Sequence, residues 1–298
     1  FKPFVYLEAM EQGISPSQQF DDSPVSYGTW HPNNYEKDFW GPTSLHDALR
    51  ESRNLVTIRL AAHIGIKSVA DLAAQIGLVD SMPHVLPAAL GAVETTVMKE
   101  AAAYATLAAG GLKVTPSLID DVQDRQGKVI WRAPSFSLVS AASQGAAAVG
   151  ADKGQPAEPN AVFPGGQADE APNAATGALS APAAAAALGM EDTPVLLDTR
   201  PRVASAQSAF QITAMLQDVM RRGTGFSAGK GIDVPIAGKT GTSQNFNDAW
   251  FAGYSPDLVT VVWIGFDTPQ SLGRNETGGV IAGPIWNKVM KTALDGYP

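Results

Sequence analysis

Residues 236–257 have the sequence IAGKTGTSQNFNDAWFAGYSPD, and the interpretation of the whole chain depends on them. A lysine lies between a glycine and a threonine, as in phosphate-binding loops of the pattern G-x-x-x-x-G-K-[ST] between a strand and a helix. Here Gly231 and Gly238 are separated by six residues instead of four. Gly241 and Asn245 also interrupt any helix after the lysine. The sequence therefore argues against a phosphate-binding loop.

Three strand-like runs follow one another in this part of the chain: VPIAGKTGT, DAWFAGYS and LVTVVWIGF. Their short links predict antiparallel neighbours in one sheet. Before them, Ala209, Ile212, Leu216 and Val219 fall at the spacing of one helix face. After them, Pro284 begins a last helix, IWNKVMKTAL. Helices, a short antiparallel meander and a final helix predict an α+β fold.

The first third of the chain has mostly helical patterns. Ser44 with Asp47, and Ser68 with Asp71, resemble capping boxes at the start of two helices. A third helix, ETTVMKEAAAYATLAAGG, is expected to end at its double glycine. VTPSLIDDV and KVIWR, joined by a turn at residues 124–127, predict a hairpin.

The composition changes between about Ala133 and Pro194, where Ala, Gly, Pro and Ser dominate and Ile, Trp and Tyr are absent. Such a segment buries too little apolar surface to offset the entropy of ordering it. We therefore predict one domain in two parts, residues 1–132 and 195–298, separated by a disordered insertion at 133–194. A tolerated surface insertion is favoured over a tether that binds a partner, because long surface loops cost little.

Composition and charge exclude several classes of function. With 45% apolar and 17% charged residues the 298-residue chain is globular, and its net charge of −8 argues against nucleic acid or an anionic membrane as partner. The absence of cysteine excludes thiol catalysis and disulfides. Four isolated histidines lack metal-ligand spacing, so we expect neither a metal nor a cofactor: His31, His46, His63 and His84.

The beginning of the sequence suggests a fragment of a longer protein. It does not begin with methionine, and FKPFVYLEAM is typical of the inside of a helix. Neither a signal peptide nor an apolar run long enough to cross a bilayer is recognisable.

One serine-enzyme motif can be rejected. GFSAG at residues 225–229 matches the nucleophile elbow, which requires a preceding strand and a histidine later in the chain. Here a helix pattern precedes the motif, and all four histidines lie upstream of it.

A second motif set is matched in order: the S-x-x-K, S-x-N and K-T-G motifs of serine enzymes that use lysine in place of histidine. The residues that match K-T-G and its continuation are Lys239, Thr240, Gly241 and Thr242. Those that match S-x-N are Ser52, Arg53 and Asn54. Lys2 supplies the lysine of the first motif, whose serine would lie two residues before Phe1. A complete S-x-x-K also occurs at 227–230, but Ser227 follows a helix and comes after S-x-N, so the missing serine is the better interpretation.

Five stretches that cover nearly the whole chain outside the insertion resemble the transpeptidase domain of class A (bifunctional) penicillin-binding proteins. They are FKPFVYLEAMEQGISPSQQFDDSP, WHPNNYEKDFWGPTSLHDALRESRN, AAAYATLAAGGLKVTPSLI, RRGTGFSAGKGIDVPIAGKTGTSQNFNDAWFAGYSPD and ETGG. The resemblance implies a five-stranded antiparallel sheet flanked by helices, with the nucleophile at the start of a central helix. It also implies an upstream glycosyltransferase domain and an N-terminal membrane anchor, on the periplasmic side of the bacterial inner membrane.

The resemblance implies a reaction with peptidoglycan stem peptides that end in D-Ala-D-Ala, for which β-lactam antibiotics substitute. The serine is acylated with loss of D-Ala, and the acyl group passes to an amine of a neighbouring strand. Lys2 would act as base, Ser52 would relay a proton to the leaving nitrogen, and Asn54 would bind the acyl chain's amide. Lys239, with the hydroxyls of Thr240 and Thr242, would bind the terminal carboxylate.

Two alternatives stay open at this stage. A serine β-lactamase shares the motifs, although class A lactamases have S-D-N, and no deacylating glutamate is evident. A non-catalytic β-lactam sensor or scaffold is the other. A single site requires the Lys2 amine and the Ser52 hydroxyl to lie about 2.6 to 3.2 Å apart. It also requires Lys239 to lie within roughly 10 Å of Ser52, and Ser227 and the histidines to lie elsewhere.

Overall fold

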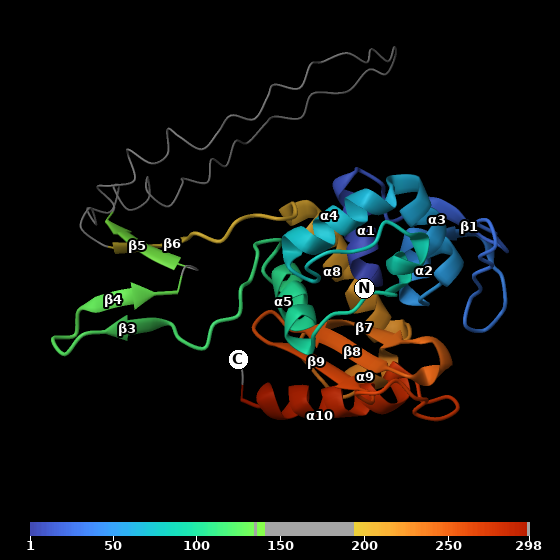
Figure 1. Ribbon diagram of the computed structural model, residues 1–298. Coiled ribbons are helices and arrows are strands. Elements are labelled where there is room, and N and C mark those ends of the chain that lie inside the picture. The colour runs from blue at the N-terminus through green and yellow to red at the C-terminus, as the bar shows by residue number, and fades with distance from the viewer. Residues whose placement is uncertain (134–135, 141–193, 297–298) are drawn as a thin grey trace, which may run out of the picture. The chain divides into compact units, whose positions relative to one another are not determined.

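The computed structural model describes residues 1–133, 136–140 and 194–296, which divide into two compact units (Figure 1). The first unit joins Phe1–Leu118 to Arg200–Pro298, and the second is Ile119–Thr199. The helices of the first unit are α1 Lys2–Glu11, α2 Leu45–Arg50, α3 Asn54–Ile64, α4 Ile66–Ile76, α5 Val97–Ala108, α8 Ala206–Arg222, α9 Phe226–Gly229 and α10 Gly283–Ala293, with short turns η1 Leu86–Leu90, η3 Gln244–Phe246 and η4 Gly278–Ala282. Its strands are β1 Gln19–Asp22, β2 Gly41–Ser44, β7 Ala237–Thr242, β8 Ala249–Tyr254 and β9 Val259–Ile264.

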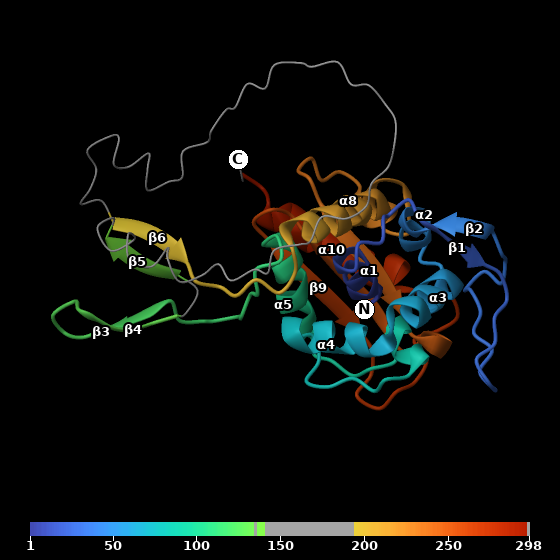
Figure 2. The same cartoon turned by 90° about the horizontal axis from the view of Figure 1, so that it is seen from above.

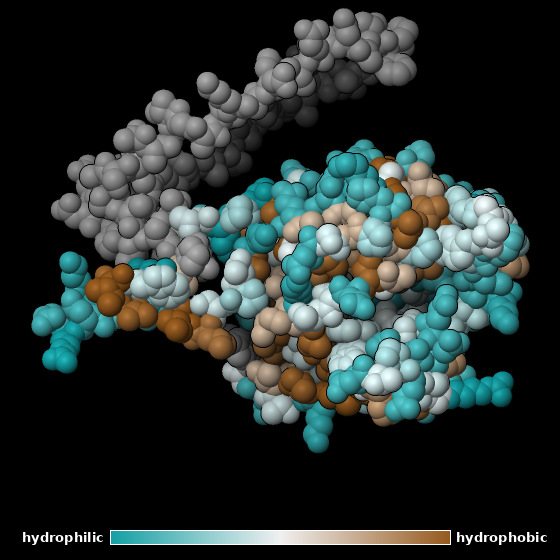
Figure 3. All heavy atoms as spheres, in the orientation of Figure 1, coloured by the Kyte–Doolittle hydropathy of each residue, from teal (hydrophilic) through white to brown (hydrophobic). Residues whose placement is uncertain are grey.

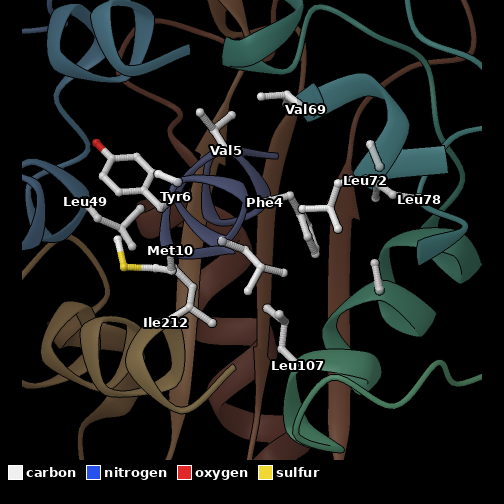
Figure 4. Close-up of a cluster of buried hydrophobic side chains, with 14 of the residues drawn as sticks. Phe4, Val5, Tyr6, Met10, Leu49, Val69, Leu72, Leu78, Leu107 and Ile212 are labelled. Atoms are coloured by element: carbon white, nitrogen blue, oxygen red, sulfur yellow. The ribbon is translucent and has the colours of Figure 1, made fainter. Parts of the chain in front are cut away.

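Helix α1 forms the centre of the first unit. Phe4, Val5, Tyr6 and Leu7 are all fully buried, as expected for a helix that is apolar on every side. The helices α2, α3, α4 and α8 pack around it (Figures 2 and 4). On the α5 side, the ring of Phe4 meets that of Tyr104 edge to face, with the centroids 5.7 Å apart. The first residues of the chain are thus held rigidly in the core.

The main sheet has the order β7-β8-β9, with antiparallel pairing throughout. Helices α5 and α8 pack on one face of this sheet, and α9 and α10 lie on its other face (Figure 1). On the α10 side Phe251 of β8 stacks on Trp286 with centroids 4.9 Å apart, and both side chains are fully buried. The predicted α+β class is confirmed. Among the described residues this sheet has three strands rather than the five implied by the resemblance, and β7 lies at its edge.

The helix starts were predicted with mixed success. Ser44 caps α2 as expected, since its hydroxyl accepts a hydrogen bond from the Asp47 amide at 3.1 Å. The second predicted capping box is wrong, because α4 begins at Ile66 and Ser68 lies inside it. Gly65, with a φ of 89°, ends α3 and turns the chain directly into α4. The early turn leaves Asp71 to pair with Lys67.

The second unit contains two antiparallel pairs, β3 Asp121–Gln123 with β4 Val129–Arg132, and β5 Phe136–Ser140 with β6 Pro194–Asp198. The first pair is a hairpin at the predicted turn, but its first strand is Asp121–Gln123 and not the longer predicted run VTPSLIDDV. Figure 3 shows apolar side chains on the visible face of this hairpin. Most of the predicted insertion at 133–194 lies outside the described residues, and its described edge forms β5. Within the described ranges, no helix combines the length and apolar character needed to cross a bilayer.

Candidate active site

Lys2 and the S-x-N segment meet in the structure, although 50 residues separate Lys2 from Ser52. The Lys2 Nζ atom lies 3.0 Å from Ser52 Oγ, within the range expected from the sequence. It also donates hydrogen bonds of 2.6 Å to the Ser52 carbonyl oxygen and to Asn54 Oδ1. A neutral amine has two hydrogens and one lone pair. The two carbonyl groups therefore use both hydrogens and leave the lone pair for a hydroxyl.

The electrostatic surroundings favour the neutral form of Lys2. Burial lowers its pKa well below the usual lysine value, and the positive charges of Lys239 and Arg53 lower it further, while Glu36 opposes them. Because the charge of Lys239 acts on Lys2, the two lysines share one electrostatic environment. A lysine held neutral in this way is suited to accept a proton from a hydroxyl.

Ser52 has a backbone conformation that its residue type rarely adopts. It lies between α2 and α3 with a φ of 58°, in the left-handed region. Its amide donates to the Leu49 carbonyl at 3.1 Å, and the Arg53 amide donates to the Ala48 carbonyl at 2.8 Å. These two hydrogen bonds stabilise the chain reversal that brings the Ser52 side chain to Lys2. Strained backbone of this kind is concentrated at functional sites.

Arg53, the middle residue of the motif, anchors the segment in the core. Its guanidinium contacts Asp22 at 2.6 Å and Asp38 at 2.7 Å, and lies 4.4 Å from the centre of the Trp40 ring. Arg53 is 3% exposed and Asp22 is fully buried. Breaking such a buried pair on one side leaves an uncompensated charge, so the pair fixes where the motif lies.

Asn34 is a supporting residue that the sequence reasoning missed. The N-cap of α3 makes no side-chain capping bond. Instead the Asn34 Oδ1 atom accepts from the amides of Asn54 and Leu55 at 2.9 and 3.2 Å. Its Nδ2 atom donates to Asp22 at 2.9 Å, and the Asn54 side chain donates to the Asn33 carbonyl at 2.9 Å. Nothing in the sequence other than the adjacent asparagines hints at this distant cap.

Lys239 lies on the edge strand and is 4% exposed. Its Nζ atom donates to the Thr240 carbonyl at 3.1 Å and lies 3.3 Å from Thr240 Oγ1 and 3.5 Å from Thr224 Oγ1. Burial lowers its pKa to about 7, against the effect of Glu51. These longer contacts leave the ammonium able to bind an anion.

Thr224 was not among the predicted site residues, yet its hydroxyl accepts a hydrogen bond of 3.0 Å from Thr240 Oγ1. It is flanked by glycines for a steric reason. A Cβ atom at Gly223 would lie 2.6 Å from the Arg50 carbonyl oxygen, and one at Gly225 would lie 2.7 Å from Met220 Sδ. Only a turn that lacks a Cβ atom at Gly223 and at Gly225 can bring Thr224 to Lys239. The sequence RGTG was therefore the signal that could have identified Thr224 as a site residue.

The end of β7 is fixed from the opposite side by η4. Thr242 Oγ1 accepts from the Gly278 amide at 3.1 Å, which leaves the hydroxyl hydrogen free to donate. A Cβ atom at Gly278 would lie 2.2 Å from the Trp250 carbonyl oxygen, so only glycine fits there. A cavity of ≈450 Å³ adjoins the strand, and its lining includes Lys239, Thr240, Gly241 and Thr242.

The rejected candidates lie in other surroundings. Ser227 is in the one-turn helix α9, with Lys230 at its end. His31 is bonded to Ser26 at 2.7 Å and His46 lies 3.5 Å from Asp218, while the His63 ring packs on Phe20. Among the residues that the structure describes, no group of histidine and acidic side chains is arranged to hold a metal.

Comparison with known proteins shows which family the chain belongs to. Residues 1–144 and 183–291 match the family profile of the penicillin binding protein transpeptidase domain. The chain belongs to this family. It is 36% identical to penicillin-binding protein 1A of Pseudomonas aeruginosa and 33% identical to penicillin-binding protein 1A of Rickettsia bellii, in each case over all of the chain. It spans about a third of the length of these relatives, 36% and 33%.

Solved structures show the same fold. The chain superposes on penicillin-binding protein 1A of Haemophilus influenzae with a TM-score of 0.74 and 28% identity, covering all of this chain and 42% of that one. A structure of PonA1 from Mycobacterium tuberculosis in complex with penicillin V has a TM-score of 0.68 and 25% identity, covering all of this chain and 68% of that one. The α+β arrangement described above is thus that of a penicillin-binding transpeptidase domain.

Proposed function

We propose that this transpeptidase domain cross-links peptidoglycan stem peptides through an acyl-serine intermediate, with the nucleophilic serine two residues before Phe1. The observation that carries the proposal is the position of Lys2 Nζ, 3.0 Å from Ser52 Oγ and 2.6 Å from Asn54 Oδ1. The S-x-N motif thereby meets the lysine of the first motif at hydrogen-bond distance. Because Lys2 lies in the first turn of α1, a serine one turn earlier lies within reach of its amine.

The proposed roles follow from the chemistry of each group. Neutral Lys2 takes the proton of the serine hydroxyl as the serine attacks the carbonyl between the two D-Ala residues. Ser52 then passes a proton to the leaving D-Ala nitrogen as the carbon–nitrogen bond breaks. An acceptor amine attacks the acyl-serine, releases the serine oxygen, and loses its own proton to the same relay. Asn54 hydrogen-bonds the amide of the acyl chain.

The edge strand β7 is proposed to hold the substrate as an added strand. Lys239, with the hydroxyls of Thr240 and Thr242, binds the terminal carboxylate. The Thr242 amide, with that of the serine, stabilises the oxyanion, and such a donor contributes on the order of 3 kcal/mol. The same groups accommodate a β-lactam, whose carboxylate and cyclic amide imitate the end of the peptide.

The longer protein is proposed to carry a glycosyltransferase domain and a membrane anchor, and to act on the periplasmic side of the bacterial inner membrane. The resemblance to class A proteins supports this proposal. The one-third share of the penicillin-binding protein 1A relatives that this chain spans is consistent with further domains.

The test compares the chain as printed with a version extended by its native upstream residues. After treatment with benzylpenicillin, mass spectrometry should find an adduct on the upstream serine of the extended version alone. The adduct should persist, and D-Ala should be released from a stem pentapeptide. An adduct on Ser52 or Ser227 would overturn the assignment. Rapid loss of the adduct would indicate a β-lactamase, and a stable adduct without D-Ala release would indicate a sensor.

A further inference from the structure

Two aromatic side chains from distant parts of the sequence meet beside the proposed site. The rings of Tyr35 and Phe246 lie edge to face at 88°, with centroids 6.2 Å apart. Tyr35 belongs to the segment between β1 and β2, and Phe246 ends η3, which follows β7. Tyr35 is 56% exposed, so this contact lies at the surface and is not part of the core.

The Tyr35 side of the contact is tied to the S-x-N segment. Asn33 accepts the hydrogen bond from the Asn54 side chain, and Asn34 caps α3 through the amides of Asn54 and Leu55. The two residues directly before Tyr35 are therefore fixed to Asn54. Its ring nevertheless projects away from this polar network towards Phe246.

The Phe246 side is tied to the K-T-G-T strand. Phe246 follows Thr242 by four residues, and its carbonyl accepts a hydrogen bond of 2.8 Å from the Leu272 amide. Asn245 and Phe246 have φ values of 60° and 57°, both in the left-handed region. Two consecutive residues other than glycine keep this conformation only where their surroundings impose it. The backbone conformation of this loop therefore fixes the position of the Phe246 ring.

We propose that Tyr35 and Phe246 are specificity-determining residues that contact the stem peptide on the N-terminal side of its D-Ala-D-Ala end. This inference rests on the proposed function. With the terminal carboxylate at Lys239 and the acyl amide at Asn54, the rest of the peptide continues past Asn54 and Thr242. Phe246 follows Thr242 by four residues, and Tyr35 follows Asn33 and Asn34, which are hydrogen-bonded to Asn54.

The aromatic pair offers apolar edges and faces to the methylene groups of the peptide's side chains. 6-Aminopenicillanic acid has the β-lactam ring and the carboxylate but no acyl side chain, so nothing in it extends past Asn54. The pair should therefore discriminate between long and short acyl donors, and should leave acylation by this compound unchanged.

The test uses the version of the protein that carries the upstream serine. Tyr35→Ala and Phe246→Ala are each expected to lower kcat/KM for D-Ala release from a stem pentapeptide roughly three- to tenfold. The acylation rate with 6-aminopenicillanic acid should stay at the parent value. Tyr35→Phe keeps the ring and should behave as the parent. Phe210→Ala, at a ring 74% exposed on α8, controls for loss of a surface aromatic.

The outcomes separate the two proposals. Rates with the pentapeptide and with 6-aminopenicillanic acid that fall together, or that both stay at the parent value, overturn the aromatic assignment. A melting temperature equal to that of the parent shows that a loss is not due to unfolding. If the parent protein itself forms no adduct and releases no D-Ala, the proposed function fails before the variants are compared.

Discussion

The site contains two buried lysines whose surroundings differ in one informative respect. Lys2 Nζ has three oxygen partners within 3.0 Å, on Ser52 and Asn54. The oxygens around Lys239 Nζ lie between 3.1 and 3.5 Å away, on Thr240 and Thr224. The first lysine is therefore already assembled with its neighbours, whereas the second keeps hydrogen-bonding capacity in reserve. This difference is expected if Lys2 moves protons and Lys239 binds a ligand.

The regions behind the two lysines differ in the same way. The S-x-N segment is anchored by the buried Arg53–Asp22 pair, which fixes charge and geometry together. The backbone of the K-T-G-T strand is held by its pairing with β8, and its threonine hydroxyls bond Thr224 and the Gly278 amide. Hydroxyl groups can turn to a ligand at little cost. The S-x-N segment is thus preorganised, whereas the hydroxyl groups of the K-T-G-T strand can exchange hydrogen-bond partners when a ligand binds.

The largest effect should follow from removal of the Lys2 amine. In the version with the upstream serine, Lys2→Met is expected to lower the acylation rate with benzylpenicillin roughly 10²- to 10⁴-fold, because the general base is lost. The rate of adduct formation, followed by mass spectrometry, is the measurement. Lys67→Met, at an exposed lysine of α4, is the matched control and should keep the parent rate. A Lys2→Met variant that acylates at the parent rate would remove Lys2 from the mechanism.

The sequence predicted the parts of the site whose chemistry depends on residue type. The order of the motifs was sufficient to pair Lys2 with Ser52, and the distance of 3.0 Å agrees with it. It also placed Lys239 and its threonines on one strand, which is β7. The roles of these residues stay predictions, to be tested by the experiments described here.

The parts that could not be predicted depend on contacts between distant segments. Asn34 caps a helix that begins twenty residues later, and no local pattern encodes such a bond. Thr224 reaches Lys239 only because the chain turns between two glycines. Ser68 shows the opposite failure, since it fits a capping box but the turn at Gly65 starts the helix earlier. Local propensity is overridden where tertiary packing sets the backbone.

An intermediate effect concerns stability and pH. The pKa of Lys239 falls from an ordinary value of 10.5 to about 7 in the folded protein. Between these values the unfolded chain binds the proton and the folded chain does not, so the free energy of unfolding rises with pH in this window. Lys2, whose pKa is also lowered, contributes in the same direction. Lys239→Met should show a smaller rise, measured by urea denaturation at several pH values from 7 to 10.

The control for this prediction is again Lys67→Met, which removes an exposed lysine and should keep the full rise. Equal pH dependence in the parent and in Lys239→Met would show that Lys239 keeps its proton throughout. In that event the strand would carry a permanent charge, and the two lysines would differ in charge as well as in hydrogen bonding.

The smallest effect should come from the Thr224 side chain, whose hydroxyl contacts Thr240 and Lys239 on the ligand-binding side. Thr224→Val keeps the shape of the side chain but removes the acceptor of the 3.0 Å bond from Thr240 and the weak contact with Lys239. A single neutral hydrogen bond of this kind corresponds to roughly a two- to threefold increase in KM for the stem pentapeptide. The value of kcat should not change, because the bond is made before the transition state and persists in it. Thr224→Ser keeps the hydroxyl and should restore the parent KM. A lower kcat at unchanged KM would place Thr224 with the proton-transfer groups, and the division of the site into a preorganised and an exchangeable side would then be wrong.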